Sequence, residues 1–199
     1  MDKWQDFKSD LQLCQNCALC KTRTNVVCGA GDPQSPIMVL GEAPGKEEDL
    51  SGQPFCGAAG KKLHGFLDQL GLDRDDIYIS NIVKCRPVRP SADGQGYANR
   101  QPTRQEISAC KAWLQRELSL INPCIIITLG AVPLSVFMPG WPKMQEYHGR
   151  PFKLADSSVT IFPLYHPAAV IYDRKKEIAY QVDLQCLHKF LREMRRNNI

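Results

Sequence analysis

Four short apolar runs, separated by segments with helical periodicity, constrain the fold of this chain most strongly. They lie at residues 37–40, 77–83, 124–129 and 159–164. The third run is apolar almost throughout, which is typical of a strand buried on both faces of a parallel sheet. Strands that alternate with helices in this way predict a three-layer α/β/α sandwich with a four-stranded parallel sheet.

Helices are expected where apolar residues recur at spacings of three and four. These segments are residues 4–13, 61–70, 104–120, 131–137 and 174–196. The apolar face predicted for the last helix is a row of residues four apart with two leucines beside it: Ile178, Val182, Cys186, Phe190, Met194, Leu187 and Leu191. No internal repeat or second domain is apparent, so a single domain over residues 1–199 is expected.

Composition places the chain among ordinary soluble globular proteins, with 43% hydrophobic and 23% charged residues. No run approaches the roughly 18 apolar residues of a membrane helix, and residues 1–6 lack the apolar core of a secretory signal. We therefore expect a cytoplasmic protein without a membrane partner. The net charge of +4 permits nucleic-acid binding without arguing for it. No feature indicates oligomerisation, and a monomer is expected.

Nine cysteines in a chain without an export signal indicate metal or thiol chemistry before disulfides. Cys14 and Cys17 form a C-x2-C pair, which brings two thiolates close enough to grip one metal centre. Such a pair needs two further ligands. Cys20, Cys85 and Cys110 are candidates on spacing alone, and the chemistry allows either zinc or an iron–sulfur cluster.

The segment after the first apolar run has the features of a ligand loop. Gly41 to Gly45 forces a sharp turn with small side chains, which lets a ligand approach the backbone. Three acids follow at residues 47–49, and then Phe55 stands between turn residues. Ligands of open α/β sheets bind beyond the carboxyl ends of the strands, where this loop is expected. The alternative is a surface loop with a solvated charge run.

Two further polar residues lie near the carboxyl ends of other predicted strands. Asn81 interrupts the second apolar run, and a buried amide costs about 1–3 kcal/mol if it stays unsatisfied. Asn81 is therefore either a turn-former or a reader of a ligand. His166 follows the last run and precedes Pro167. It is expected on the same rim as Glu42 and Asn81, with a capping histidine as the alternative.

Residues 86–104 show no apolar period and are expected to form a basic, flexible loop. The segment contains Tyr97 and four arginines: Arg86, Arg89, Arg100 and Arg104. Either it is a solvated excursion or its arginines contact phosphate. Thr103 and Glu106 then have the spacing of a capping box that opens the helix at 104–120.

Taken in order, four motifs resemble those of the family 4 uracil-DNA glycosylases, the iron–sulfur branch of the uracil-DNA glycosylase superfamily. They are G-E-A-P-G-K-E-E-D from Gly41, G-Q-P-F-C-G-A-A-G from Gly52, N-I-V-K-C-R-P from Asn81 and H-P-A from His166. The resemblance extends from Cys14 to the last helix. It implies a monofunctional hydrolase of base excision repair, which removes uracil from DNA and leaves an abasic site, and a [4Fe–4S] cluster.

Carried over by position, the resemblance makes Cys14, Cys17, Cys85 and Cys110 the cluster ligands. The other five cysteines match no ligand and are expected to be small buried apolar residues: Cys20, Cys28, Cys56, Cys124 and Cys186. The chain departs from the family between Cys85 and Cys110, where 24 residues form a longer interval than usual. The role of residues 88–98 is left open.

The resemblance also assigns the base pocket. Phe55 would stack on the flipped uracil, the amide of Asn81 would read its Watson–Crick edge, and Gly41, Glu42 and Ala43 would complete the cradle. His166 would donate a hydrogen bond to uracil O2 as negative charge builds there.

The water-activating carboxylate is not fixed by the resemblance. Family 1 relatives have G-Q-D-P-Y in the first motif, and Ala43 occupies the position of their catalytic aspartate. Glu42 and Glu48 are the remaining candidates. Gly45 replaces the tyrosine that excludes the thymine methyl group, and Glu48 beside Phe55 is expected to take over that role.

Near the last strand, Val170 and Ile171 are either an apolar wedge for the minor groove, with Arg174 on a phosphate, or core residues. Two alternatives to uracil excision are also open. One is a glycosylase with broader deaminated-base specificity. The other is a non-catalytic iron–sulfur or zinc module that binds DNA.

Overall fold

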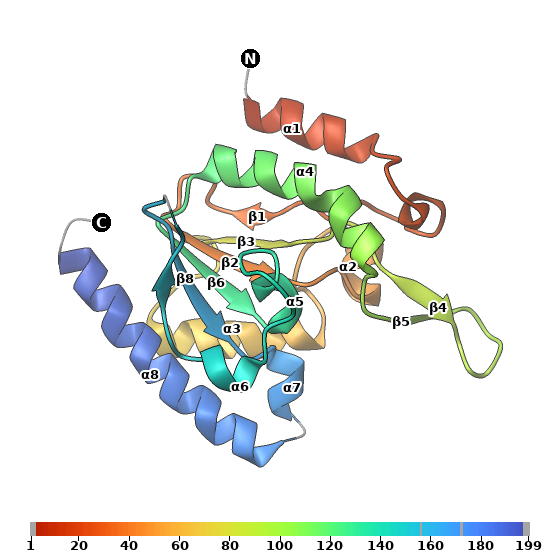
Figure 1. Cartoon of the computed structure of the whole chain (residues 1–199). Coiled ribbons are helices and arrows are strands. Elements are labelled where there is room, and N and C mark those ends of the chain that lie inside the picture. The colour runs from red at the N-terminus through yellow and green to blue at the C-terminus, as the bar shows by residue number, and fades with distance from the viewer. Residues whose placement is uncertain (1–2, 156, 172, 197–199) are drawn as a thin grey trace.

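The computed structural model, which describes residues 3–155, 157–171 and 173–196, is built around a six-stranded mixed sheet (Figure 1). Its strand order is β1-β3-β2-β6-β8-β7. The four inner strands are parallel and correspond to the four predicted apolar runs: β3 (Tyr78–Asn81), β2 (Ile37–Gly41), β6 (Ile125–Leu129) and β8 (Thr160–Leu164).

Two antiparallel edge strands correct the expectation of a purely parallel sheet of four. β1 (Ala30–Gly31) pairs with β3, and β7 (Phe152–Lys153) pairs with β8. Each has only two residues, which is too short for a period of two to show in the sequence. The predicted parallel arrangement is therefore the centre of a larger mixed sheet.

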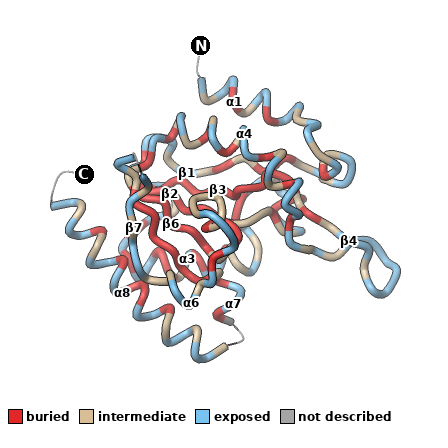
Figure 2. Tube along the Cα trace, viewed as in Figure 1, coloured by how far each residue is buried: buried red, intermediate tan, exposed pale blue. Residues whose placement is uncertain are grey.

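Helices cover both faces of the sheet, which confirms the three-layer α/β/α sandwich. α1 (Lys3–Gln12), α4 (Arg104–Ile121) and α5 (Ala131–Leu134) pack on one face, where Met38 points. α3 (Ala58–Leu70) and α8 (Arg174–Arg196) pack on the other, where Val39 points. Figure 2 shows that burial concentrates in the strands between these layers.

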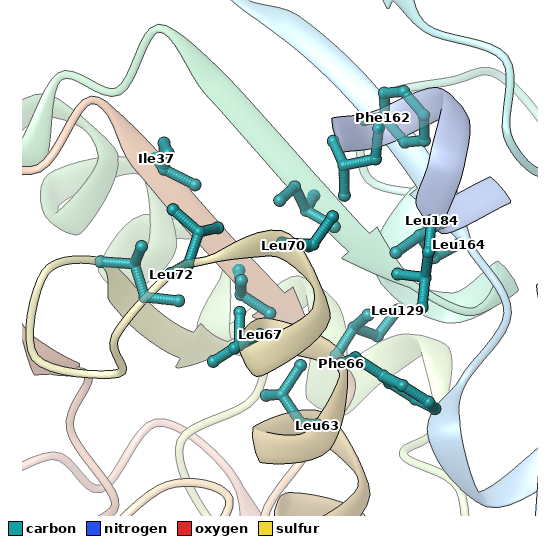
Figure 3. Close-up of a cluster of buried hydrophobic side chains, with 14 of the residues drawn as sticks. Ile37, Leu63, Phe66, Leu67, Leu70, Leu72, Leu129, Phe162, Leu164 and Leu184 are labelled. Carbon is teal, nitrogen blue, oxygen red and sulfur yellow. The ribbon is translucent and has the colours of Figure 1, made fainter. Parts of the chain in front are cut away.

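The core beneath α3 follows directly from the helical period. Leu63, Phe66, Leu67 and Leu70 recur at three and four residues and face β2 and β6 (Figure 3). Leu184 of α8 enters the same cluster. Each fully buried side chain of this kind stabilises the fold by about 1.5–3 kcal/mol. The packing of α3 and α8 therefore holds the sheet rigid beneath the carboxyl ends of its strands.

The row of residues four apart predicted for α8 is wrong at its first three members. Ile178 is 62% exposed, Val182 is 53% exposed and Cys186 is also exposed. The two leucines predicted beside the row, Leu187 and Leu191, are buried, together with Tyr180 and Leu184, which are not predicted. Residues strictly four apart advance 40° per step around a helix of 3.6 residues per turn. Such a row therefore turns away from the core, whereas alternating spacings of four and three keep residues on one face.

No helix in the described ranges has the length and apolarity needed to cross a membrane.

Residues 86–104 are not an irregular loop, because they contain a β-hairpin. β4 (Val88–Pro90) pairs with β5 (Tyr97–Asn99). Arg86 donates to Asn99 Oδ1 at 2.6 Å, and Arg100 donates to the carbonyl of Val88 at 2.9 Å. Two of the four arginines, which are predicted either to be solvated or to contact phosphate, therefore fasten the base of this hairpin.

The remaining short elements are also absent from the sequence-based prediction. They are α2 (Lys46–Ser51), a 3-10 helix (Ala18–Lys21), α6 (Met144–Tyr147) and α7 (Pro167–Ile171). α2 matters most for the site, because it turns the expected acidic loop into one and a half turns of helix. Glu48 and Asp49 are buried in it, so this part of the charge run is not solvated.

Candidate functional site

A cleft opens at the carboxyl ends of the parallel strands. It encloses about 1470 Å³, open solvent included, and is lined by segments that follow β2, β3 and β8 and by the base of the hairpin. Six of the seven residues predicted for the base pocket and the catalytic site line it: Glu42, Ala43, Glu48, Phe55, Asn81 and His166. The seventh, Gly41, lies directly beneath two of them.

Gly41 shows how closely the pocket is assembled. A Cβ at this position would lie 2.4 Å from Asn81 Oδ1 and 2.4 Å from Phe55 Cζ, well inside van der Waals contact. Only glycine lets the ring and the amide meet over the backbone here. The parallel pairing of Gly41 with Asn81 fixes that juxtaposition through the sheet register.

Phe55 is held in a conformation that it would not choose alone. Its φ of 53° lies in the left-handed region, which costs a non-glycine residue roughly 1–2 kcal/mol. Arg74 donates to the carbonyl of Phe55 at 3.0 Å and also to the carbonyl of Pro54. A Cβ at Gly60 would lie 1.8 Å from that Phe55 oxygen, so the first turn of α3 closes against the same peptide.

Asn81 presents an amide to the cleft without a partner from the protein. The residue is 3% exposed, and no group in the described part of the chain hydrogen-bonds its side-chain amide. Its backbone carbonyl, by contrast, accepts from Lys84 Nζ at 2.7 Å. The amide is not among the enclosed, unpartnered side-chain atoms of the described ranges, so it reaches the cleft and can hydrogen-bond a ligand that offers one donor and one acceptor.

Lys84 belongs to a buried charged network that the sequence analysis does not predict. Lys84 Nζ donates to Ser80 Oγ at 2.7 Å and forms an ion pair with Glu117 of α4. The Tyr78 hydroxyl donates to Glu117 at 2.7 Å, and burial beside that carboxylate raises the pKa of Tyr78. This network joins β3, and hence Asn81, to α4.

His166 has a defined tautomer. Its Nδ1 accepts from the N–H of Ala168 at 3.2 Å, so the ring proton resides on Nε2. Burial lowers the pKa of His166 below the usual histidine value. The side chain is therefore a neutral imidazole whose remaining ring N–H is free to donate inside the cleft.

The two candidate carboxylates have different surroundings. Glu48 Oε1 accepts from the N–H of Gly57 at 2.8 Å, and its Oε2 accepts from the N–H of Gly45 at 3.0 Å. Glu48 thereby clamps the start of α2 to the segment after Phe55. Glu42 lines the cleft with no side-chain hydrogen bond in the described ranges, and burial raises its pKa.

The four predicted cluster ligands border one small cavity. Cys14 and Cys17 come from the segment after α1, Cys85 follows β3, and Cys110 lies in the second turn of α4. Cys20 lines the same cavity, although the resemblance makes it no ligand. Burial raises the pKa of Cys85 to about 11 and also raises that of Cys110, so these thiols need a bound cation to ionise at neutral pH.

Three of these sulfur atoms accept hydrogen bonds from the protein. The donors are Trp113 Nε1 to Cys14 at 3.1 Å, Arg23 to Cys85 at 3.3 Å and the N–H of Lys84 to Cys110 at 3.4 Å. Such donors stabilise thiolates and set the potential of iron–sulfur clusters. In the described ranges no three His, Cys, Asp or Glu side chains converge to hold a single metal ion.

The expectation that the other five cysteines are buried is wrong. Cys56 and Cys186 are exposed, and Cys20, Cys28 and Cys124 are half-buried. Cys186 lies on the solvent side of α8, and Cys56 lies in the turn before α3 with its sulfur 3.2 Å from Ser51 Oγ. Apolar character alone does not decide burial for so small a side chain in a turn or on an outer helical face.

The wedge interpretation of the segment after β8 is not supported at Val170. Val170 is 8% exposed and packs into the core between α3 and α8. The side chain of Ile171 lies outside the described part of the structure, and Arg174 is exposed.

The chain is similar to known proteins over most of its length. The family model described as the uracil DNA glycosylase superfamily matches residues 28–194. The chain is 39% identical over 180 residues to the type-4 uracil-DNA glycosylase of Sulfurisphaera tokodaii, covering 87% of this chain and 78% of the relative. It is 36% identical to the enzyme of the same name from Archaeoglobus fulgidus (93% and 92%) and 38% identical to that of Saccharolobus solfataricus (87% and 79%).

Proposed function

The chain belongs to the uracil-DNA glycosylase superfamily and, within it, to the type-4 enzymes, and on this premise we propose that the protein excises uracil from DNA. It hydrolyses the N-glycosidic bond and leaves an abasic site for base excision repair. The observation that carries the proposal is the unpaired amide of Asn81, buried against Phe55 in a cleft that also holds a neutral His166.

Recognition follows from the chemistry of the base. Uracil must leave the DNA stack to reach the cleft, at a cost of a few kcal/mol. The ring of Phe55 stacks on it, while the oxygen of the Asn81 amide accepts from N3–H and the NH2 group donates to O4. Cytosine presents the opposite pattern, so it would leave polar groups mispaired, which is how such sites reach high discrimination.

Bond cleavage uses charge that develops late. Negative charge accumulates on uracil O2 as the glycosidic bond breaks, and the Nε2–H of His166 donates to that oxygen. One preorganised donor of this kind changes the rate by about 10²–10³. The carboxylate of Glu42 faces the cationic sugar and orients the attacking water.

We assign Glu48 a positioning role, because backbone donors occupy both of its oxygens. It holds Gly45 against the segment that carries Phe55. This wall is our proposal for what excludes the methyl group of thymine. The carbonyl of Glu42 is engaged with the N–H of Val83 at 3.1 Å, so the cradle for the base draws on the remaining backbone groups of Gly41, Glu42 and Ala43.

We further propose that Cys14, Cys17, Cys85 and Cys110 hold a [4Fe–4S] cluster. The N–H donors aimed at their sulfurs support this assignment. When bound, the cluster supplies iron–thiolate bonds that cross-link the N-terminal segment to β3 and α4. No catalytic step passes through it.

The proposal is tested with an oligonucleotide that contains one uracil. After incubation with the purified holoprotein, alkali should cut the strand at the uracil position, and an oligonucleotide with thymine there should stay intact. Hypoxanthine and xanthine substrates measure whether the specificity is broader. If no alkali-labile site forms with any of these bases, the protein is no glycosylase.

A further inference from the structure

A second groove opens beside the cleft, and none of the catalytic steps uses it. Its floor is apolar and includes Ile82, Ile107 and Leu114, and its rim carries Arg104, Lys111 and Trp141. The side chains come from the residue that follows β3, from the first three turns of α4 and from the segment after α5.

The groove adjoins the cleft along two segments of chain. Asn81 lines the cleft and Ile82 lines the groove; Gln101 lines the cleft and Arg104 lines the groove. α4 leads into β6 and runs antiparallel to it, so α4 begins at the carboxyl edge of the sheet (Figure 1). A strand of DNA that delivers a base to the cleft therefore passes next to the groove.

The chemistry of the rim selects a class of ligand. Trp141 is 47% exposed, and the guanidinium of Arg104 lies 5.9 Å from the centre of its ring. No carboxylate lines the groove, and neither Arg104 nor Lys111 forms an ion pair within the described ranges. An open aromatic ring next to two uncompensated cations matches a nucleotide, whose base stacks and whose phosphate binds the cations.

We propose that this groove binds an unpaired nucleotide that flanks the uridine on the same strand. Its base stacks on Trp141, and its phosphate lies against Arg104 and Lys111. The identity of the strand rests on the proposed function. The nucleotide must be unpaired, because a base that stays in a duplex is stacked on its neighbours and cannot lie on the ring.

Binding is the first test, because it needs no catalysis. A fluorescent, uracil-free single-stranded oligonucleotide is titrated with holoprotein and followed by anisotropy. Trp141→Ala should weaken binding by about 5- to 100-fold, the range of one base on one aromatic ring. Tyr97→Ala is the matched control, since Tyr97 is 57% exposed but lies on the hairpin. It should change binding less than twofold. Arg104→Gln and Lys111→Gln should each reduce the salt slope by roughly 0.7.

The second test locates the base. Replacing the flanking bases one at a time with an abasic spacer should weaken the wild type at one position, and Trp141→Ala should be insensitive to the spacer there. The inference would be overturned if Trp141→Ala and Tyr97→Ala lost equal affinity for the oligonucleotide. It would also be overturned if Trp141→Ala weakened binding of a fully paired duplex as much as binding of the single strand. Uracil release by the same proteins is scored separately. If uracil is released but Trp141→Ala does not weaken oligonucleotide binding, only the nucleotide-binding groove is refuted. If Trp141→Ala weakens binding but no uracil is released, only the glycosylase assignment is refuted.

Discussion

At Asn81 the protein presents to the cleft an amide that no group in the described part of the chain hydrogen-bonds. This amide is not among the side-chain atoms that are both enclosed and unpartnered in the described ranges, so it reaches the cleft. Gly41 adds no side chain beside it, and Phe55 presents only a ring. The pocket therefore keeps the amide available to a pyrimidine edge with one donor and one acceptor.

For His166, replacement by alanine should lower kcat by about 10²–10³ and change KM little, because the hydrogen bond to O2 strengthens only as charge develops. His188→Ala is the control, since this histidine is exposed on α8. Single-turnover kinetics on a uracil oligonucleotide separate the two parameters. A loss confined to affinity would contradict the assigned role.

For Glu42, replacement by glutamine should lower activity at neutral pH and raise the stability of the fold. Burial raises the pKa of Glu42, so the folded state disfavours the ionised form. The direction follows from linkage. The contribution of Glu42 to the free energy of unfolding is most favourable at acidic pH, and it is lost as the pH rises through the pKa of Glu42 in the folded state. Thermal melts at several pH values should show Glu42→Gln gaining most above that pKa.

The same group sets the acid limb of the rate. Protonation of Glu42 removes the charge that orients water. As the pH is lowered, activity should therefore begin to fall above the ordinary glutamate pKa of about 4.3. A pH profile of kcat measures it, and a limb unchanged in Glu42→Gln would refute the assignment.

Between elements, Arg74 links the turn before β3 to the segment that carries Phe55. Arg74→Ala should free the two carbonyls and let Phe55 leave its left-handed conformation. Hydrogen bonds from a charged donor contribute about 1.5–3 kcal/mol each, so inhibition by free uracil should weaken by roughly tenfold or more. Arg74→Lys should restore only part of this, because one ammonium cannot reproduce the fork of a guanidinium.

Arg150→Ala, at an exposed arginine, is the control for Arg74. The inhibition constant for uracil is the readout, because a merely structural defect lowers the melting temperature without changing it. Unchanged uracil inhibition in a folded Arg74→Ala protein would show that the ring needs no such anchor.

The elements of the fold differ in how well the sequence predicts them. The four inner strands and α4 are predictable, since β6 is a continuous apolar run and Thr103 with Glu106 forms the capping box at 3.2 and 2.7 Å. The hairpin at Val88–Asn99 is not, because three-residue strands carry no measurable alternation. The error in the α8 row is avoidable from the sequence, because residues strictly four apart advance 40° per step around a helix.

The site divides in the same way. Phe55, Asn81 and His166 are found from motifs at strand ends, which the parallel topology brings to one edge. Arg74 and the pair of Lys84 with Glu117 are not found, because each acts on a residue that is adjacent only in space. Charged residues of this kind look like surface residues in a sequence.

Across the whole molecule, the cysteine cavity and the cleft lie on opposite sides of one short stretch of chain. Lys84 donates its backbone N–H to Cys110 and its ammonium group to the carbonyl of Asn81. The cavity also receives the segment after α1, and Phe7 and Leu11 of α1 itself pack against α4 in one apolar cluster. A cluster there fastens the N-terminal helix, β3 and α4 into one unit behind the pocket.

Cys85→Ala should therefore bleach the brown colour expected of the holoprotein and lower its melting temperature. In a chain of this size each kcal/mol shifts the melting temperature by about 2–4 °C, and we expect a drop of roughly 5–15 °C. Cys186→Ala, at an exposed cysteine on α8, should change neither colour nor stability. Protease cleavage near α1 should accelerate only in Cys85→Ala, because that helix loses its cross-link but keeps its apolar contacts. An anaerobic preparation of the wild type that is colourless and contains zinc would refute the iron–sulfur assignment. The same two variants would then still test whether a metal at this site cross-links the three segments.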